Sequence, residues 1–189
     1  MKFFKIKKIY KEKGFSLVEA LIAISILMIS VAAPLKLASD GVRNTATAKQ
    51  QMVAYYLTQD AMEYVISIKI GNRLENNDIL DGLSGCVIGN VNVDHGCEID
   101  TMDNTIKNYP TVPQENYPLL DFDEVNGVYR VSPSSYDESR FSRQVKIYEK
   151  RIDPDSTKIL EARVEVVTRW RDYKGEWQDY ILISNILDW

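Results

Sequence analysis

The strongest hydrophobic pattern in the chain is an apolar stretch close to its N-terminus. Residues 15–33 hold one charged side chain, Glu19, among nineteen positions. A helix crosses the hydrocarbon core of a bilayer with about 20 apolar residues, so this stretch predicts a transmembrane helix. It is longer than the apolar region of a secretory signal peptide, which has about 7–15 residues.

Helical periodicity continues after Pro34. Apolar residues then recur at spacings of three and four and form one face of a helix: Ala54, Leu57, Ala61, Val65 and Ile68. Gly71 and Asn72 supply a stop signal. We therefore expect one long helix in two parts, an apolar part over residues 15–37 and an amphipathic part over residues 38–70. Pro34 should kink it, because its ring lacks a backbone donor and clashes with the preceding turn.

The middle of the chain has no regular hydrophobic pattern. Residues 71–127 are rich in Gly, Asn and Asp, and we interpret them as a variable loop region between the helix and a sheet. A short strand is compatible with Cys86–Ile88. The stretch Asn108–Pro113 holds two prolines and predicts a turn.

The last third of the chain alternates between apolar and polar positions, as half-buried strands do. Four segments carry this pattern: Val128–Val131, Phe141–Ile147, Leu160–Trp170 and Trp177–Ile186. The third is the longest and places five apolar residues on one face: Leu160, Ala162, Val164, Val166 and Trp170. Residues 128–189 are thus expected to form a three- or four-stranded antiparallel sheet packed on the helix, and the fold class is α+β.

Composition and charge narrow the function classes. A chain of 189 residues that is 45% hydrophobic and 26% charged is composed like a folded protein. Its net charge of −4 argues against direct binding of nucleic acid. Residues 1–14 carry six lysines and one acid, so the rest of the chain has 17 basic and 26 acidic residues. By the positive-inside rule, such a basic head stays in the cytoplasm and the C-terminal part lies outside.

Two general interpretations of the N-terminus leave features unexplained. One is a simple membrane anchor, and the other is a signal peptide cleaved at the small residues Ser30–Ala32. Neither accounts for Glu19, since a carboxylate in the middle of a membrane costs roughly 2.5–3.5 kcal/mol on insertion scales. Neither requires Gly14 directly before Phe15.

A specific motif accounts for both residues. Lys13–Ala23 reads Lys-Gly-Phe-Ser-Leu-Val-Glu-Ala-Leu-Ile-Ala, which resembles the prepilin motif of type IV pilins and of the pseudopilins of type II secretion. The motif consists of a basic leader, a glycine, an aromatic residue, and a glutamate at the fifth position of the mature chain, inside an apolar helix. The order of long helix, loop region and sheet also resembles the pilin architecture.

The resemblance implies a processing and assembly pathway. Residues 1–14 would be a leader that prepilin peptidase removes by cutting between Gly14 and Phe15, followed by N-methylation of Phe15. Glu19 would pair with the new amine of a neighbouring subunit, since a buried carboxylate is tolerable when paired. The implied partners are the peptidase, other pilin or pseudopilin subunits and the inner-membrane assembly platform. The implied location is the inner membrane, with the C-terminus outside, and then a periplasmic or extracellular filament.

Cys86 and Cys97 are the only cysteines. An outward topology places them in an oxidising compartment, where a disulfide is favoured. Two free buried thiols are the alternative. A zinc site with His95 fits no usual ligand spacing.

Other candidate chemistry is weak. Four acids lie near Cys97, namely Asp94, Glu98, Asp100 and Asp103; they lack the EF-hand calcium pattern and are interpreted as a solvated acidic loop. His95 has no triad partners in a known pattern, and no phosphate-binding loop occurs. We therefore predict no catalytic residue, no cofactor and no metal.

These observations favour a structural subunit, a minor pilin or pseudopilin, over an enzyme. The order Phe141-x-Arg143-x-Val145 followed by Val167–Trp170 resembles the minor pilin V and pseudopilin I group. The alternative is a signal-anchored or secreted β-rich binding module, similar to an adhesin. That class needs neither Gly14 nor Glu19, and these two residues discriminate between the classes.

Overall fold

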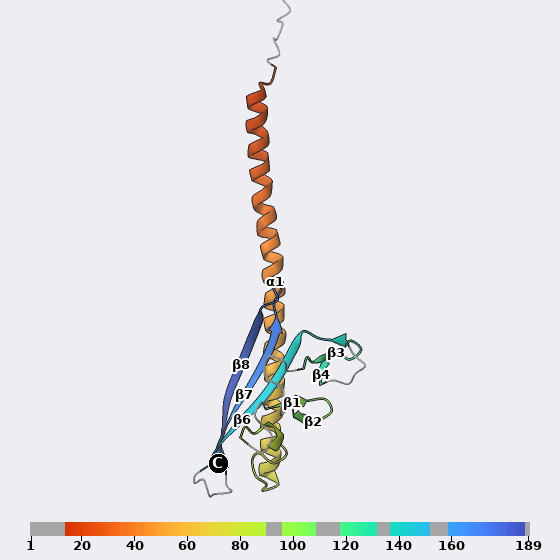
Figure 1. Ribbon diagram of the computed structural model, residues 1–189, viewed down its shortest axis with the longest axis vertical. Coiled ribbons are helices and arrows are strands. Elements are labelled where there is room, and N and C mark those ends of the chain that lie inside the picture. The colour runs from red at the N-terminus through yellow and green to blue at the C-terminus, as the bar shows by residue number, and fades with distance from the viewer. Residues whose placement is uncertain (1–13, 90–95, 109–117, 132–136, 152–158, 188–189) are drawn as a thin grey trace, which may run out of the picture. The chain divides into compact units, whose positions relative to one another are not determined.

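A computed structural model describes residues 14–89, 96–108, 118–131, 137–151 and 159–187. The chain divides into two compact units, Met1–Thr45 and Ala46–Trp189. Helix α1, Leu17–Leu74, contributes to both (Figure 1). The α+β class is confirmed, since this helix is followed by antiparallel strands.

Helix α1 ends later than the expected stop at Gly71 and Asn72. Asn76 adopts a left-handed conformation with φ 57°, which closes the last helical turn. Asn72 does not stop the helix; its side-chain amide donates a 2.8 Å hydrogen bond to the Asp81 carbonyl and so holds the following loop. Pro34 lies inside α1 and does not end it. The kink at Pro34 remains a prediction.

The second unit contains two sheets (Figure 1). The main sheet has five antiparallel strands in the order β2-β1-β6-β7-β8. Their bounds are β1 Cys97–Asp100, β2 Thr105–Asn108, β6 Phe141–Arg151, β7 Ile159–Arg171 and β8 Trp177–Leu187. A smaller sheet has the order β4-β3-β5, with β3 Asp121–Asp123, β4 Val128–Arg130 and β5 Asp137–Glu138.

These sheets refine the expected layout. The main sheet has five described strands where three or four were expected, and the expected strand at Val128 belongs to the smaller sheet as β4. The region expected as a loop, residues 71–127, contains β1, β2, β3 and the 3-10 helix η1, Ser84–Cys86. Val87 forms an isolated parallel bridge with Ile147 where a short strand was considered.

The core lies between the second half of α1 and the sheets. Four of the five predicted helix-face residues are buried, namely Ala54, Leu57, Ala61 and Val65. From β7 the predicted residues Ala162, Val164, Val166 and Trp170 are buried as well, while the side chain of Leu160 lies outside the described residues. Thr58 donates a 2.7 Å hydrogen bond to the Thr168 hydroxyl and joins the helix to β7.

A disulfide joins Cys86 in η1 to Cys97 in β1, with 4.6 Å between their Cα atoms. Both cysteines are fully buried. The predicted disulfide is confirmed, and the free-thiol and zinc alternatives for this pair are wrong. His95 lies outside the described residues.

Candidate assembly segment

Among its described residues, the first unit presents an exposed apolar helix surface. Helix α1 is long and apolar enough to cross a membrane, and none of its most apolar 18-residue window is buried. From Leu17 to Leu35 the helix extends roughly 28 Å at 1.5 Å per residue, close to the thickness of about 30 Å of a bilayer core. Such a surface is typical of a segment that lies in a lipid or protein environment.

Local hydrogen bonds adapt this segment to an apolar environment. The Ser16 hydroxyl accepts a 3.3 Å hydrogen bond from the Glu19 backbone N–H and so caps the start of the helix. Ser25 and Ser30 each donate a 2.8 Å hydrogen bond to a backbone carbonyl of the preceding turn. Their hydroxyl groups are thereby satisfied within the helix, as a water-free environment demands.

The predicted processing and assembly residues lie together at the start of α1. Gly14 and Phe15 directly precede the helix, and the Phe15 side chain is 73% exposed. Glu19 lies in the first helical turn and is exposed. Within the part of the chain that the structure describes, no side chain forms an ion pair with the Glu19 carboxylate. Its charge is therefore available to a group outside the described residues.

The structure gives Gly14 no role in folding. A Cβ added at Gly14 would meet no atom within 4 Å, and its φ is not in the left-handed region. A side chain would therefore fit there without strain. The fold of the described residues therefore does not explain why a glycine occupies this position.

One family model matches the start of this segment. Residues 9–33 match the prokaryotic N-terminal methylation motif. The matched residues include Gly14, Phe15 and Glu19 and the apolar stretch that ends at Ala33. The comparisons with curated proteins and with solved structures return no match.

The methylation motif supports a protein of the type IV pilin or pseudopilin class. The architecture agrees, because a long N-terminal helix followed by an antiparallel sheet is pilin-like. The motif and the exposed apolar helix are consistent with membrane anchoring and with a pilus-like filament. Proteins of this motif family are structural.

The acidic residues near Cys97 do not form the solvated loop expected from the sequence. Glu98 and Asp100 are buried in β1, with 1% and 3% of their surface exposed. The Arg130 guanidinium lies 3.7 Å from the Asp100 carboxylate and also forms an ion pair with Asp103. The described residues contain no group of three or more acids, histidines or cysteines placed to hold a metal. Asp94 lies outside them.

Hydrogen bonding explains why Asp100 is tolerated in a buried strand. Burial raises the pKa of Asp100, but this effect is outweighed by backbone N–H donors from Asp103, Val131 and Met102 and by the charge of Arg130. The net result is an Asp100 pKa below the ordinary value of an aspartate. Asp100 is therefore a structural carboxylate that organises the turn after β1.

Proposed function

We propose that the protein is a minor pilin or pseudopilin, a structural subunit of a type IV pilus-like filament or of a type II secretion pseudopilus. The observation that carries the proposal is the methylation motif over residues 9–33 at the head of an exposed apolar helix. The folded second unit, Ala46–Trp189, would be the part displayed outside the membrane.

Processing would begin with a cut by prepilin peptidase between Gly14 and Phe15. The open surroundings of Gly14 support this step, because the fold itself does not need a glycine there. A residue without a side chain lets the backbone enter a narrow cleft. The exposed Phe15 would then become the N-methylated first residue.

Glu19 would act in assembly by pairing with the Phe15 amine of a neighbouring subunit. Its exposure and its lack of an ion-pair partner among the described side chains support this role. Inside a bundle of apolar helices an unpaired carboxylate is strongly unfavourable, and pairing with an amine removes most of that cost. The pairing would set the axial register of one subunit against the next.

The charge distribution supports the proposed topology. Six lysines in residues 1–14 would remain in the cytoplasm, and the acidic second unit would lie on the outer side of the inner membrane. Other subunits would contact the apolar half of α1, and the assembly platform would extract the helix from the membrane. In this role the chain is a substrate of the peptidase and carries no activity of its own. Within the class, the resemblance at Phe141–Val145 favours the minor pilin V and pseudopilin I group.

The role of Glu19 is tested by the variant Glu19→Ala in the native host. We expect the variant to be cut and methylated like the wild type, but to fall at least about tenfold in the sheared filament fraction, since the lost pairing exceeds 1.4 kcal/mol. The measurement is an immunoblot of sheared and membrane fractions. Asp40→Ala is the matched control, because Asp40 is an exposed acid on the same helix.

Wild-type amounts of Glu19→Ala in the filament fraction would refute the role of Glu19. Absence of the wild-type protein from every filament fraction would instead favour the anchored binding module. That alternative uses the same second unit but needs no subunit pairing.

A further inference from the structure

Strand β8 forms one edge of the main sheet. It pairs with β7 on one side, and Figure 1 shows no described element along its other side. In an antiparallel sheet, every second residue of an edge strand points its backbone N–H and C=O groups away from the neighbouring strand. With 11 residues, Trp177–Leu187, β8 therefore offers a long row of backbone donors and acceptors to a further strand.

Strand β8 lacks the features that usually keep an edge strand from pairing. It contains no lysine and no proline, and its register with β7 is continuous, without a bulge. Its one charged residue, Asp179, is already engaged by a 2.6 Å hydrogen bond from the Arg169 side chain. Natural proteins protect exposed edges with charges, prolines or bulges, so the edge of β8 favours pairing with a partner.

The exposed face of β8 carries apolar side chains at alternating positions. Ile181 and Ile183 are 52% and 49% exposed, and Trp177 and Leu187 are exposed on the same face near the ends of the strand. The opposite face is used by the fold, since Ile186 on that face is buried. A strand placed beside β8 would therefore meet two isoleucines, two residues apart.

One end of this face is positively charged. Arg171 pairs in register with Trp177, and its guanidinium lies 4.7 Å from the centroid of the Trp177 ring. Arg171 is exposed and forms no ion pair with any described residue. Since the ring attracts the cation, the Arg171 charge stays beside the start of β8 and favours an acidic group on a partner.

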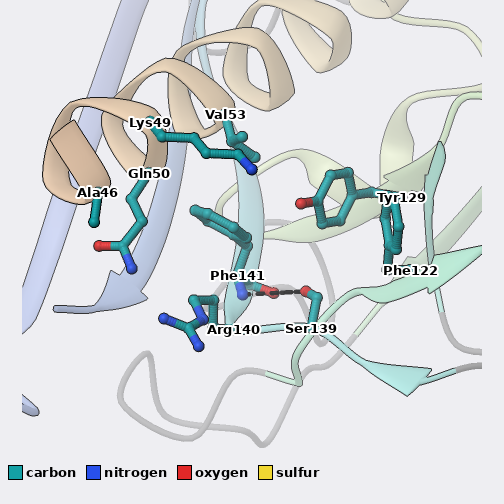
Figure 2. Close-up of a pocket in the computed structure, with 9 residues that line it drawn as sticks. All are labelled: Ala46, Lys49, Gln50, Val53, Phe122, Tyr129, Ser139, Arg140 and Phe141. Carbon is teal, nitrogen blue, oxygen red and sulfur yellow. Dashed lines mark hydrogen bonds between the residues drawn. The ribbon is translucent and has the colours of Figure 1, made fainter. Parts of the chain in front are cut away.

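The open cavity of about 430 Å³ beside α1 has no comparable pattern (Figure 2). The Phe141 ring in its lining is 4% exposed, and the Arg140 guanidinium points away from the aromatic rings. The edge of β8, in contrast, presents backbone groups and side chains in a fixed order, and that order defines the partner.

We propose that β8 binds an extended segment of a partner protein, which adds a further strand to the main sheet. The segment pairs antiparallel to β8, as the other strands of the sheet do, and antiparallel pairing is slightly the more stable per residue. It carries apolar residues opposite Ile181 and Ile183 and an acidic residue opposite Trp177, within reach of Arg171.

The direction of α1 disfavours a second copy of the chain as this partner. Residues at the end of β7 cluster with an earlier part of α1 than residues at its start do, so the helix runs along the strands. Antiparallel pairing of two β8 strands about a two-fold axis would therefore point the two helices in opposite directions. Two subunits anchored in one membrane cannot adopt this arrangement, a step that rests on the proposed function.

The test is the binding of a designed peptide to the full chain in detergent micelles. The probe is Thr-Ser-Ile-Val-Ile-Ser-Thr-Ser-Glu, labelled with a fluorophore at its N-terminus and amidated at its C-terminus. Placed antiparallel to β8, it sets its isoleucines opposite Ile183 and Ile181 and its glutamate opposite Trp177. We expect saturable binding by fluorescence anisotropy and slower amide hydrogen exchange within residues 177–187.

Two backbone-methylated peptides separate strand pairing from general apolar adhesion. Each carries N-methyl groups at every second amide, in one of the two possible phases. One phase blocks all the amides that face β8, and the other leaves those amides free. We expect the first peptide to lose binding and the second to bind like the parent peptide.

Variants of the chain locate the binding at β8. Ile183→Lys should weaken binding of the peptide at least about fivefold, because a charge replaces one half of an apolar cross-strand pair. Val125→Lys is the matched control, since Val125 is 91% exposed outside the strands and its replacement should leave the affinity unchanged. Arg171→Glu should weaken binding of the parent peptide and favour a peptide that ends in lysine.

Three results would overturn the proposal. The first is no binding of the peptide at millimolar concentration. The second is equal behaviour of the two methylated peptides, which would mean that backbone pairing is not involved. The third is a wild-type dimer in micelles that Ile183→Lys converts to a monomer, which would make β8 an interface between copies. None of these results concerns cleavage at Gly14, which the mass of the purified chain tests separately.

Discussion

Arg143 is the largest fully buried side chain in the described part of the protein, with 1% of its surface exposed. Its guanidinium donates 2.9 Å hydrogen bonds to the Leu57 carbonyl and the Asp60 carboxylate, and it also donates to the Ile99 carbonyl. One side chain thus joins α1, β1 and β6. Thr101 adds a 2.9 Å hydrogen bond to the same Asp60 carboxylate.

Removal of this side chain should destabilise the second unit strongly. Arg143→Ala is expected to lower the free energy of unfolding by about 3 kcal/mol or more, because a cavity and unpaired polar groups replace a hydrogen-bonded cation. Arg163→Ala is the control, since Arg163 is a largely exposed β7 residue whose ion pair is worth at most about 1 kcal/mol. Urea unfolding measures both, and equal losses in the two variants would contradict this role of Arg143.

The lowered pKa of Asp100 predicts how the stability of the fold depends on pH. Its folded-state pKa lies below the unfolded value of about 3.9. The carboxylate therefore stabilises the fold above that pH, and its contribution is lost as the pH falls through the folded-state pKa. Asp100→Asn should be less stable than the wild type near neutral pH, with the difference shrinking as the pH falls below about 4.

Urea midpoints from about pH 6 to about pH 3 measure this difference. Asp81→Asn serves as the control, because Asp81 is an exposed acid outside the sheets. A stability gap between Asp100→Asn and the wild type that stays constant or widens on acidification would show that the Asp100 charge does not support the fold.

The burial of Arg143 could not be predicted from the sequence. Arg143 occupies an inward position of β6 between Phe141 and Val145, where alternation assigns apolar residues and a charged side chain breaks the pattern. The burial of Arg143 is tolerated because its guanidinium donates hydrogen bonds to carbonyl groups of α1 and β1. The local sequence of β6 does not show that these groups lie beside it.

At the scale of elements, the disulfide holds the irregular part of the second unit. It connects η1 to β1 across a sequence separation of 11 residues, and β1 pairs in turn with β2 and β6. A cross-link that closes a loop of this size stabilises a fold by about 3 kcal/mol, chiefly by restricting the unfolded chain.

Replacement of both cysteines should remove that contribution. The variant Cys86→Ala/Cys97→Ala is expected to lose about 2–4 kcal/mol of unfolding free energy, measured by urea unfolding. Reductant should destabilise the wild type by a similar amount and leave the double variant unchanged. A wild type whose urea midpoint does not respond to reductant would contradict the prediction.

The elements differ in how well the sequence predicts them. Strands β7 and β8 have 13 and 11 residues, long enough for alternation to be visible. Strands β1, β2 and β3 have three or four residues each and contain Asp and Asn, so no periodic signal exists. Strand β1 pairs with β6 and is joined to η1 by the disulfide, and β3 pairs with β4 and β5, so these strands are fixed by partners that their own short sequences do not specify. The late end of α1 likewise depends on the conformation of Asn76.

At the scale of the whole molecule, the two units have surfaces of opposite character. The first unit is an exposed apolar helix segment that needs an environment outside the chain. The second buries two clusters of apolar residues between its helix and its sheets. A chain built in this way suits a subunit that is embedded by one unit and displays the other, and the methylation motif at the start of the helix supports that division of roles.

The most direct test of this account is the intact mass and the N-terminal sequence of the protein purified from host membranes. The account predicts a chain that begins at Phe15 and is heavier by one methyl group than the unmodified cleaved chain. A chain that begins at Met1 would indicate a plain membrane anchor, and one that begins near Ala33 would indicate a conventional secreted protein. Either result would contradict processing by prepilin peptidase and the assembly role of Glu19.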